Sequence, residues 1–221
     1  NGADRHTIGG THSAYTATAP TRACNYISWA DGMAYADWAG LRPMTELEFE
    51  KACRGPLYPV SNEYAWGTTA YTNRTGYSGT GGLDGSGTET ATPATANCVF
   101  SSGPTRCGLF ATSVSDRQGA GASYWGILDM SGNLMERLVS VGGTVGRGFT
   151  DVHGDGTLTV SGEVSVVSWP PLNGGGCLRD GYWNYYAPAE YCQVSRRAMG
   201  YYGYGAGLRH ATSGFRFVRS A

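Results

Sequence analysis

Apolar positions recur with a helical period in two short stretches near the beginning of the chain. In the first stretch, ISWADGMAYADWAG, Ser28 and Asp31 have the spacing of a capping box, and Gly40 ends the run. The apolar positions that fall near one helical face are Trp29, Met33, Tyr35 and Ala36. This pattern predicts a short amphipathic helix between Ser28 and Gly40.

The second helical stretch is RPMTELEFEKACRG. Thr45 and Glu48 form an S/T-x-x-E capping box, and Gly55 followed by Pro56 ends the run. The apolar surface of this second helix is expected to come from Leu47, Phe49 and Ala52. Two short helices therefore lie in the first quarter of the chain.

Shorter patterns replace the helical period after the second helix. Aromatic residues at Tyr64, Trp66 and Tyr71 are suited to fill the core from strands or loops. Residues 74–97 are rich in Gly, Thr and Ser, so we expect a surface excursion there, and the alternation in 158–169 predicts a hairpin. The expected fold class is α+β, with two short helices, short antiparallel strands and much irregular loop.

The composition of the chain excludes several classes of protein. The 221 residues include 35 glycines, about twice the usual share and without a collagen-like period, which favours turns and irregular loops. The formal net charge is −1 and the basic residues are scattered, so nucleic-acid binding is not expected. No apolar stretch approaches the roughly 20 residues that cross a bilayer, so we expect no membrane span.

The six cysteines do not form a recognisable metal or redox motif. No C-x-x-C pair occurs, so neither a zinc ribbon nor a thioredoxin-type site is expected. The positions are Cys24, Cys53, Cys98, Cys107, Cys177 and Cys192. Their even number leaves open whether they are buried thiols or form one or two disulfides.

Five motifs occur in a fixed order along the chain: SWADGMAYADWAGLRPMTELEFEKACRG, YAWG, YWGILDMSGNLMERL, RDGYW and SGFRFVRS. In this order and spacing they resemble the formylglycine-generating-enzyme family, a branch of the C-type lectin fold. The resemblance runs from about Ser28 to Arg219 and implies a C-type lectin fold of the formylglycine-generating-enzyme type for residues 28–221. Residues 1–27 are then expected to be an N-terminal entry segment.

The resemblance also implies a catalytic motif. Enzymes of this family bind copper through two cysteines separated by four residues, and Cu(I) prefers such soft thiolate ligands. The corresponding stretch of this chain holds Cys192 alone, with Asn184 or Tyr185 where the first cysteine would fall. Another branch binds iron through histidines, which here are scattered at His6, His12, His153 and His210. We therefore expect no enzymatic activity and no required cofactor.

One metal site of the family has counterparts in this chain. In the family, the segment that matches LDMSGNLMERL wraps a calcium ion, and oxygen ligands suit this hard cation. The residues that the resemblance assigns to it are Asp129, Gly132, Leu134 and Glu136. A calcium ion there would be structural. The alternative is that Asn133 and Glu136 hydrogen-bond a buried turn.

Seven of the fifteen tyrosines lie between residues 182 and 204. Tyrosine mixed with Gly, Ala, Ser and Asn is typical of binding loops in antibodies, and the stretch YYGYGAG has neither a strand nor a helical period. The pattern also resembles the variable proteins of diversity-generating retroelements, which carry this same fold. Within residues 179–216, the resemblance implies exchangeable ligand-binding positions at Tyr182, Asn184, Tyr185, Tyr186, Glu190, Tyr201, Tyr202, Tyr204, His210 and Ala211. Fixed scaffold positions would be Gly181, Trp183, Cys192, Val194, Ser195 and Phe215.

These patterns together favour a display protein whose C-terminal surface binds a macromolecular ligand, protein rather than sugar. Such a protein would lie on a phage particle or a bacterial cell surface. The side chains expected to share one exposed face are those of Tyr185, Tyr201, Tyr202 and His210. Two alternatives stay open: a formylglycine-generating-type metal-dependent oxidase, and a calcium-dependent carbohydrate-binding lectin. The chain lacks the E-P-N and Q-P-D motifs of ordinary lectins.

Overall fold

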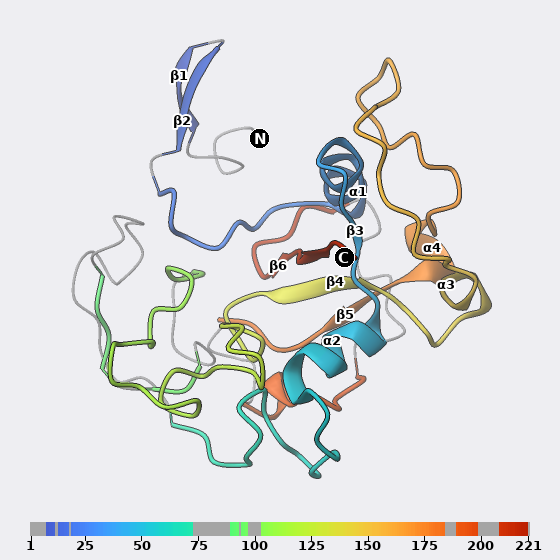
Figure 1. Ribbon diagram of the computed structural model, residues 1–221. Helices are drawn as coiled ribbons and strands as arrows, with labels where there is room; N and C mark the ends of the chain where they lie inside the picture. Colours follow the sequence, from blue (N-terminus) through green and yellow to red (C-terminus); the bar gives the residue numbers. More distant parts are fainter. Residues whose placement is uncertain are drawn as a thin grey trace.

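Long irregular segments join the few helices and short strands of the protein (Figure 1). This architecture confirms the α+β class expected from the sequence. The computed structural model describes residues 8–11, 13–17, 19–72, 89–92, 94–96, 103–183, 189–198 and 208–220. The helices are α1 (Trp29–Trp38), α2 (Glu46–Arg54), α3 (Thr144–Arg147), α4 (Leu172–Gly175) and the 3₁₀ helix η2 (Ala189–Cys192). No helix in these ranges is long and apolar enough to cross a membrane.

Three small sheets occur in the described part of the chain. Their strands are β1 (Ile8–Thr11), β2 (Ala14–Ala17), β3 (Arg42–Pro43), β4 (Met135–Val139), β5 (Gly176–Arg179), β6 (Ser213–Gly214) and β7 (Phe217–Val218). β1 pairs with β2 and β3 with β7, both antiparallel, and the third sheet has the order β5-β4-β6. β4 is antiparallel to β5 but parallel to β6. The expectation of antiparallel strands is therefore wrong for the last pair, because a long connection lets β6 return in the same direction.

Both predicted helices begin at their predicted caps. Ser28 Oγ accepts a hydrogen bond from the Asp31 backbone N–H (3.2 Å), and the Ser28 N–H donates to Asp31 Oδ2 (2.8 Å). Thr45 and Glu48 form the same reciprocal pair at the start of α2, at 3.2 and 2.9 Å. Each box satisfies two backbone donors that an uncapped first turn would leave unpaired.

The buried face of α2 differs from the predicted one. Phe49 is buried as expected, but Leu47 is 60% exposed. Its place in the interior is taken by Glu46 and Arg54, which are 1% and 6% exposed. Charged side chains can occupy these positions because both are engaged in ion pairs with residues of other segments. The sequence could not reveal those partners.

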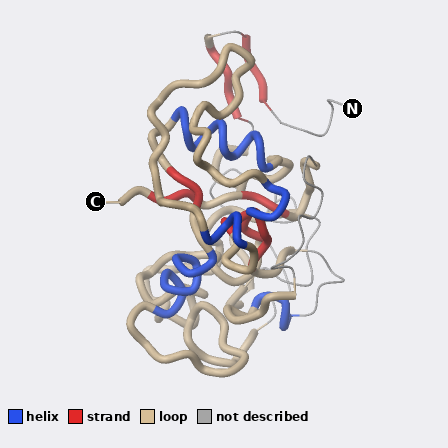
Figure 2. Tube along the Cα trace, turned by 90° about the vertical axis from the view of Figure 1, so that its right-hand side faces the viewer, coloured by secondary structure: helices blue, strands red, loops and turns tan. Residues whose placement is uncertain are grey.

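Strand β4 divides the core into two clusters. Successive residues of a strand point to opposite faces, and Leu138 and Val139 are both fully buried. Leu138 belongs to a cluster with Phe49 of α2, whereas Val139 belongs to a cluster with Trp29 of α1. The two helices therefore cover opposite faces of the sheet, and helices lie above and below the central strands in both views (Figures 1 and 2).

Two hairpin assignments differ from expectation. The segment 158–169 forms one β-bridge, between Leu158 and Val164, rather than a pair of strands. Val160, near its turn, is fully exposed, whereas Val164 and Val166 pack half-buried against the core cluster of α1, so only one arm of the expected hairpin finds core surface. β1 and β2, by contrast, form a hairpin inside the entry segment 1–27, where the sequence has no periodicity.

The expected surface excursion, residues 74–97, is described only at 89–92 and 94–96, where Thr90 is exposed, 91–92 are half-buried and the other residues are buried. Glu89 and Ala94 are 2% and 4% exposed. Ala94 packs in a small cluster with Leu109 and Phe110. Tertiary contacts therefore hold part of the described residues, and the surface excursion stays a prediction for 74–88, 93 and 97, which lie outside the described residues.

Candidate functional site

The predicted ligand-binding region, residues 179–216, begins where β5 ends. Asp180 adopts a left-handed φ of 71°, and its Oδ2 accepts a hydrogen bond from the Gly132 N–H (2.7 Å). At the next residue, Gly181, an added Cβ would lie 2.4 Å from Cys192 Sγ. Only glycine allows this close approach, so the first turn of the region is fixed against the buried Cys192.

Trp183 connects the two ends of the region. Its backbone N–H donates to the carbonyl of Asn133 (3.1 Å), and its indole Nε1–H donates to the carbonyl of Ala211 (3.1 Å). The same Ala211 carbonyl accepts a second hydrogen bond from Asn25 Nδ2 (2.8 Å). One indole and one backbone oxygen thus hold together the two ends of residues 182–211, which are called the tyrosine-rich window below.

Three arginines tie residues 194–197 to α2 and β5. The contacts are Arg54 Nη2 to Ser195 Oγ (2.5 Å), Arg179 Nη2 to the Val194 carbonyl (2.5 Å) and Arg197 Nη2 to Glu50 Oε1 (2.5 Å). The Val194 side chain is also buried in the core, at 1% exposure. The segment after η2 is therefore anchored through both its backbone and its side chains.

Arg179 is the centre of this anchoring network. Its side chain is 0% exposed and donates to Glu46 Oε1 (2.8 Å) and Glu50 Oε1 (2.7 Å). Burial by itself would raise the pKa of Glu50, but hydrogen bonds from Arg179 and Arg54 outweigh it and hold that pKa below its ordinary value. A buried guanidinium needs such partners, so the network fixes β5 against α2.

Four of the predicted ligand-binding positions lie within the described residues. Glu190 and His210 are exposed, and Tyr182 and Ala211 are half-buried. The positions outside the described residues are Asn184, Tyr185, Tyr186, Tyr201, Tyr202 and Tyr204. Of the four side chains expected to share one exposed face, His210 alone is described, and it is exposed. The shared face therefore stays a prediction.

Two of the four residues expected to bind calcium, Asp129 and Glu136, contact the Arg216 guanidinium. Arg216 Nε donates to Glu136 Oε1 (2.7 Å), and Arg216 Nη2 donates to the carbonyls of Leu128 (2.9 Å) and Asp129 (2.7 Å). Asp129 Oδ2 accepts from the Gly108 N–H (2.7 Å). The positive charge next to Glu136 and Asp129 is thus supplied by a side chain of the protein itself.

The rest of the expected calcium segment forms a hydrogen-bonded turn. The Leu134 N–H donates to the Gly132 carbonyl (3.0 Å), and Asn133 Oδ1 accepts from the Thr105 N–H (2.9 Å). Among the residues that the structure describes, no group of three or more His, Cys, Asp or Glu side chains could hold a metal ion. Asn133 hydrogen-bonds at a buried turn, as the alternative expects, whereas Glu136 pairs with Arg216 instead. The calcium assignment stays a prediction.

Three buried carboxyl groups, those of Asp129, Glu136 and Asp180, interact with Arg216. Burial raises the pKa of Glu136 to about 7, although Arg216 opposes the shift. Burial and the neighbouring Glu136 charge raise the pKa of Asp180 well above its ordinary value, and burial also raises that of Asp129. A carboxyl group that is buried with too few cations is favoured in its protonated form. This cluster therefore carries a surplus of acid.

The cysteines fall into both of the classes that the sequence left open. Cys192 is disulfide-bonded, and its partner lies outside the described residues. The free thiols are Cys24, Cys53, Cys107 and Cys177. Copper would need two thiolates, and a cysteine in a disulfide cannot supply one. The described cysteines do not fit the copper pair that the resemblance implies.

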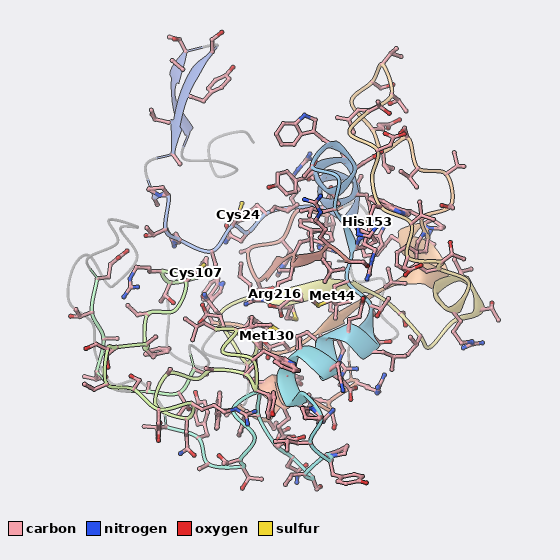
Figure 3. All side chains as sticks on the ribbon, in the orientation of Figure 1. Cys24, Met44, Cys107, Met130, His153 and Arg216 are labelled. Carbon is pink, nitrogen blue, oxygen red and sulfur yellow. The ribbon has the colours of Figure 1, made fainter. Side chains whose placement is uncertain are left out.

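The structure contains a pocket beside α1 that the sequence did not predict. A cavity of about 460 Å³ lies between α1, residues 23–27, the beginning of β4 and residues 214–217. Cys24, Cys107 and Arg216, all of which line it, lie near one another in Figure 3. No local motif signals this pocket, because its wall is assembled from segments that are far apart along the chain.

Comparison with known proteins gives the family. Residues 2–221 match the sulfatase-modifying factor enzyme 1-like domain, so the chain belongs to that family. The match begins within the segment 1–27, which the motifs placed before the domain. No solved structure matches the chain.

The curated relatives are similar over short stretches. The formylglycine-generating enzyme of Streptomyces coelicolor is 48% identical over 48 residues, which cover 22% of this chain and 15% of that enzyme. The formylglycine-generating enzyme of Thermomonospora curvata is 48% identical over 48 residues, which cover 20% of this chain and 16% of that enzyme. The formylglycine-generating enzyme of Mus musculus is 45% identical over 42 residues, which cover 19% of this chain and 11% of that enzyme. The aligned stretches span only 11% to 16% of these relatives.

These relatives overturn one expectation from the sequence. The lack of a copper pair and of clustered histidines predicts a protein without enzymatic activity. The family that the chain belongs to is named for an enzyme, and the curated relatives carry the name of an enzyme. The prediction of no enzymatic activity is therefore contradicted. It treated the missing copper and iron ligands as evidence against any activity in a member of this family.

Proposed function

We propose that residues 179–216 bind a macromolecular ligand, protein rather than sugar, and that the chain is the variable protein of a diversity-generating retroelement on a C-type lectin fold. The observation that carries the proposal is the hydrogen bond from Trp183 Nε1 to the Ala211 carbonyl (3.1 Å). It ties the ends of the tyrosine-rich window through one fixed side chain and a backbone atom. Side chains between them can then be exchanged without loss of this contact.

Both buried and exposed positions occur within the described part of the region. Cys192 and Val194 are 0% and 1% exposed, while Glu190 and His210 are exposed. Tyrosines among small residues offer a large rigid contact area at a low entropic cost, and the best such contacts are worth about 2 kcal/mol or more. Buried anchors beside exposed positions support a surface whose affinity can change while the scaffold stays folded.

Sequencing the same locus in sister isolates tests this proposal. We expect substitutions to concentrate at the ten predicted positions, from Tyr182 to Ala211, and to spare residues 41–55. The matched control within the same sequences is the anchor set, of which Trp183, Cys192 and Val194 should stay constant. Uniform drift along the chain, or substitutions shared equally by anchors and exposed positions, would contradict the proposal.

Formylglycine generation is the second candidate, because the curated relatives carry that name. Copper, where it binds, would supply the oxidation chemistry, but Cys192 is disulfide-bonded, so this activity would need other ligands. The test is the copper content of the purified protein together with oxidation of a cysteine-containing peptide. Stoichiometric copper together with turnover of the peptide would favour this candidate. Turnover combined with an invariant sequence among the sister isolates would contradict the ligand-binding proposal.

A further inference from the structure

The pocket beside α1 has a mostly apolar wall that is rich in aromatic rings. Its volume of about 460 Å³ lies in the range of small-molecule sites, roughly 300–1,000 Å³. The apolar lining includes Ile27, Tyr35, Leu134, Phe215 and Phe217. The rings of Phe215 and Phe217 stack with centroids 5.2 Å apart, and the Tyr35 ring lies 5.5 Å from that of Phe217. Such a wall suits a ligand with an apolar, ring-sized body.

Arg216 brings a hydrogen-bond donor to this pocket. The residue lines the cavity, and its side chain is 29% exposed. Nε donates to Glu136 Oε1, and Nη2 donates to the carbonyls of Leu128 and Asp129. Nη1 makes no hydrogen bond to a described residue, and it is not one of the side-chain atoms that are buried without a partner. It is therefore the guanidinium nitrogen that can donate to a ligand in the cavity.

The charges next to Nη1 disfavour a charged ligand of either sign. The Glu136 carboxylate, 2.7 Å from Nε, already compensates the charge of the guanidinium. A ligand carboxylate at Nη1 would approach the side chains of Glu136 and Asp129, which also line the pocket, and an ammonium group would meet the guanidinium itself. A neutral oxygen avoids both repulsions and still accepts a strong hydrogen bond from a charged donor.

We propose that this pocket binds a small neutral organic molecule, an apolar body that carries one carbonyl group, with the carbonyl oxygen accepting a hydrogen bond from Arg216 Nη1. The apolar body would lie against Tyr35 of α1 and against Phe215 and Phe217 near the end of the chain. A ligand of this class does not depend on the tyrosine-rich window, so the inference goes beyond the proposed function.

Two thiols on the pocket wall provide a direct readout. Cys24 and Cys107 are free and exposed, and both line the cavity. Cys53 and Cys177 are free but buried, so their reaction in the same sample would reveal unfolding rather than an empty pocket. The rate of alkylation by iodoacetamide at each thiol, followed by peptide mass spectrometry, reports whether the pocket is occupied.

Four probes with the same phenyl group separate the head group from apolar contact. The ketone is 4-phenyl-2-butanone, the cation is 4-phenyl-2-butanamine, the anion is 3-phenylpropionate, and propylbenzene has no acceptor. The experiment is run at about pH 8, above the pKa of about 7 of Glu136, so that this carboxyl group is ionised. All four probes are titrated against the same alkylation rates of Cys24 and Cys107.

We expect the ketone to protect both thiols at the lowest concentration. Propylbenzene should need about tenfold more, since a hydrogen bond to a charged group is worth about a factor of ten. The amine and the carboxylate should also need about tenfold more, because each meets a like charge at Nη1. Equal protection by the ketone and propylbenzene, no protection by the ketone, or protection by either charged probe at the concentration of the ketone would overturn the proposal.

A matched pair of variants at the rim tests the location. Cys24→Trp places a large side chain in the pocket and should abolish protection of Cys107 by the ketone, whereas Cys24→Ser should keep it. Cys24 is exposed, so neither variant removes a buried group from the core. Protection of Cys107 that survives in Cys24→Trp would place the ketone elsewhere and refute the site.

Discussion

Arg216 Nε donates to Glu136 Oε1 at 2.7 Å, and this pair joins the end of the chain to the central strand β4. The arginine belongs to the motif SGFRFVRS and the glutamate to LDMSGNLMERL, so two recognisable motifs meet in one ion pair. Their meeting explains why the segment expected to bind calcium already contains a cation. It also places the buried acids next to the pocket beside α1.

Removal of Arg216 should destabilise the protein strongly. We expect Arg216→Ala to lower the free energy of unfolding by about 3–5 kcal/mol, because it leaves buried carboxylates without their cation. Chemical denaturation measures this change. The control is Arg209→Ala, since Arg209 pairs with Asp31 at a partly exposed site and should cost about 1 kcal/mol or less. Similar losses in both variants would contradict the buried cluster.

The protein should lose stability as the pH rises through neutrality. Glu136 has an ordinary pKa of 4.5 in the unfolded chain and a pKa of about 7 when folded. Its stabilising contribution is fully present below pH 4.5 and is lost as the pH rises through about 7, by up to about 3 kcal/mol. Unfolding between about pH 5 and pH 8 measures this slope, and Glu136→Gln should make it shallower.

The other described carboxyl groups with shifted pKa values that bear on this cluster either titrate below that pH window or add to the same slope. The pKa of Glu50 is lowered despite its burial, so the stability that it contributes is present above its ordinary pKa of 4.5 and is lost only at lower pH. The pKa values of Asp129 and Asp180 are raised by burial and act in the same direction as that of Glu136. A stability that increases from pH 5 to pH 8 would contradict the prediction.

Two arginines that share the partner Glu46 should differ in their contribution. Arg179→Ala is expected to cost about 3–5 kcal/mol, because its side chain is 0% exposed and Glu46 would be left buried. Arg197→Ala should cost about 1 kcal/mol or less, because that side chain is 47% exposed. The free energies of unfolding of the two variants decide the point. Equal costs would mean that the network does not anchor β5 through Arg179.

Anchors and exposed positions of the predicted ligand-binding region should respond differently to truncation. Val194→Ala removes buried methyl groups from the core and should cost about 2 kcal/mol. Glu190→Ala removes an exposed side chain paired with Arg196 at 3.1 Å, and should change stability by about 0.5 kcal/mol or less. Thermal unfolding of both variants checks this. A larger loss for Glu190→Ala would mean that the exposed positions are structural.

Local sequence signals were reliable where the cause is itself local. Both capping boxes form as predicted, because each depends on residues three positions apart. Tyr64 and Trp66 are buried and stack with ring centroids 4.7 Å apart, as their apolar area favours. Leu47 shows the limit of such signals, since its exposure was decided by the partners of Glu46 and Arg54.

The candidate sites were predictable to different degrees. Of the six scaffold positions that the resemblance implies, the structure buries Gly181, Cys192 and Val194, leaves Trp183 and Phe215 half-buried, and exposes Ser195. The calcium assignment did not anticipate Arg216, 80 residues after Glu136, which supplies a positive charge beside that carboxylate. The pocket beside α1 was not predictable for the same reason, because residues far apart along the chain line it.

The sequence by itself determined the two capped helices, the loop-rich α+β class and the family motifs, because these depend on neighbouring residues or on their order. The tertiary structure alone decided the parallel pairing of β4 with β6, the acidic cluster around Arg216 and the pocket beside α1. Each of these joins segments that are far apart along the chain. Their energies come from burial and charge pairing, which exist only after the segments have packed together.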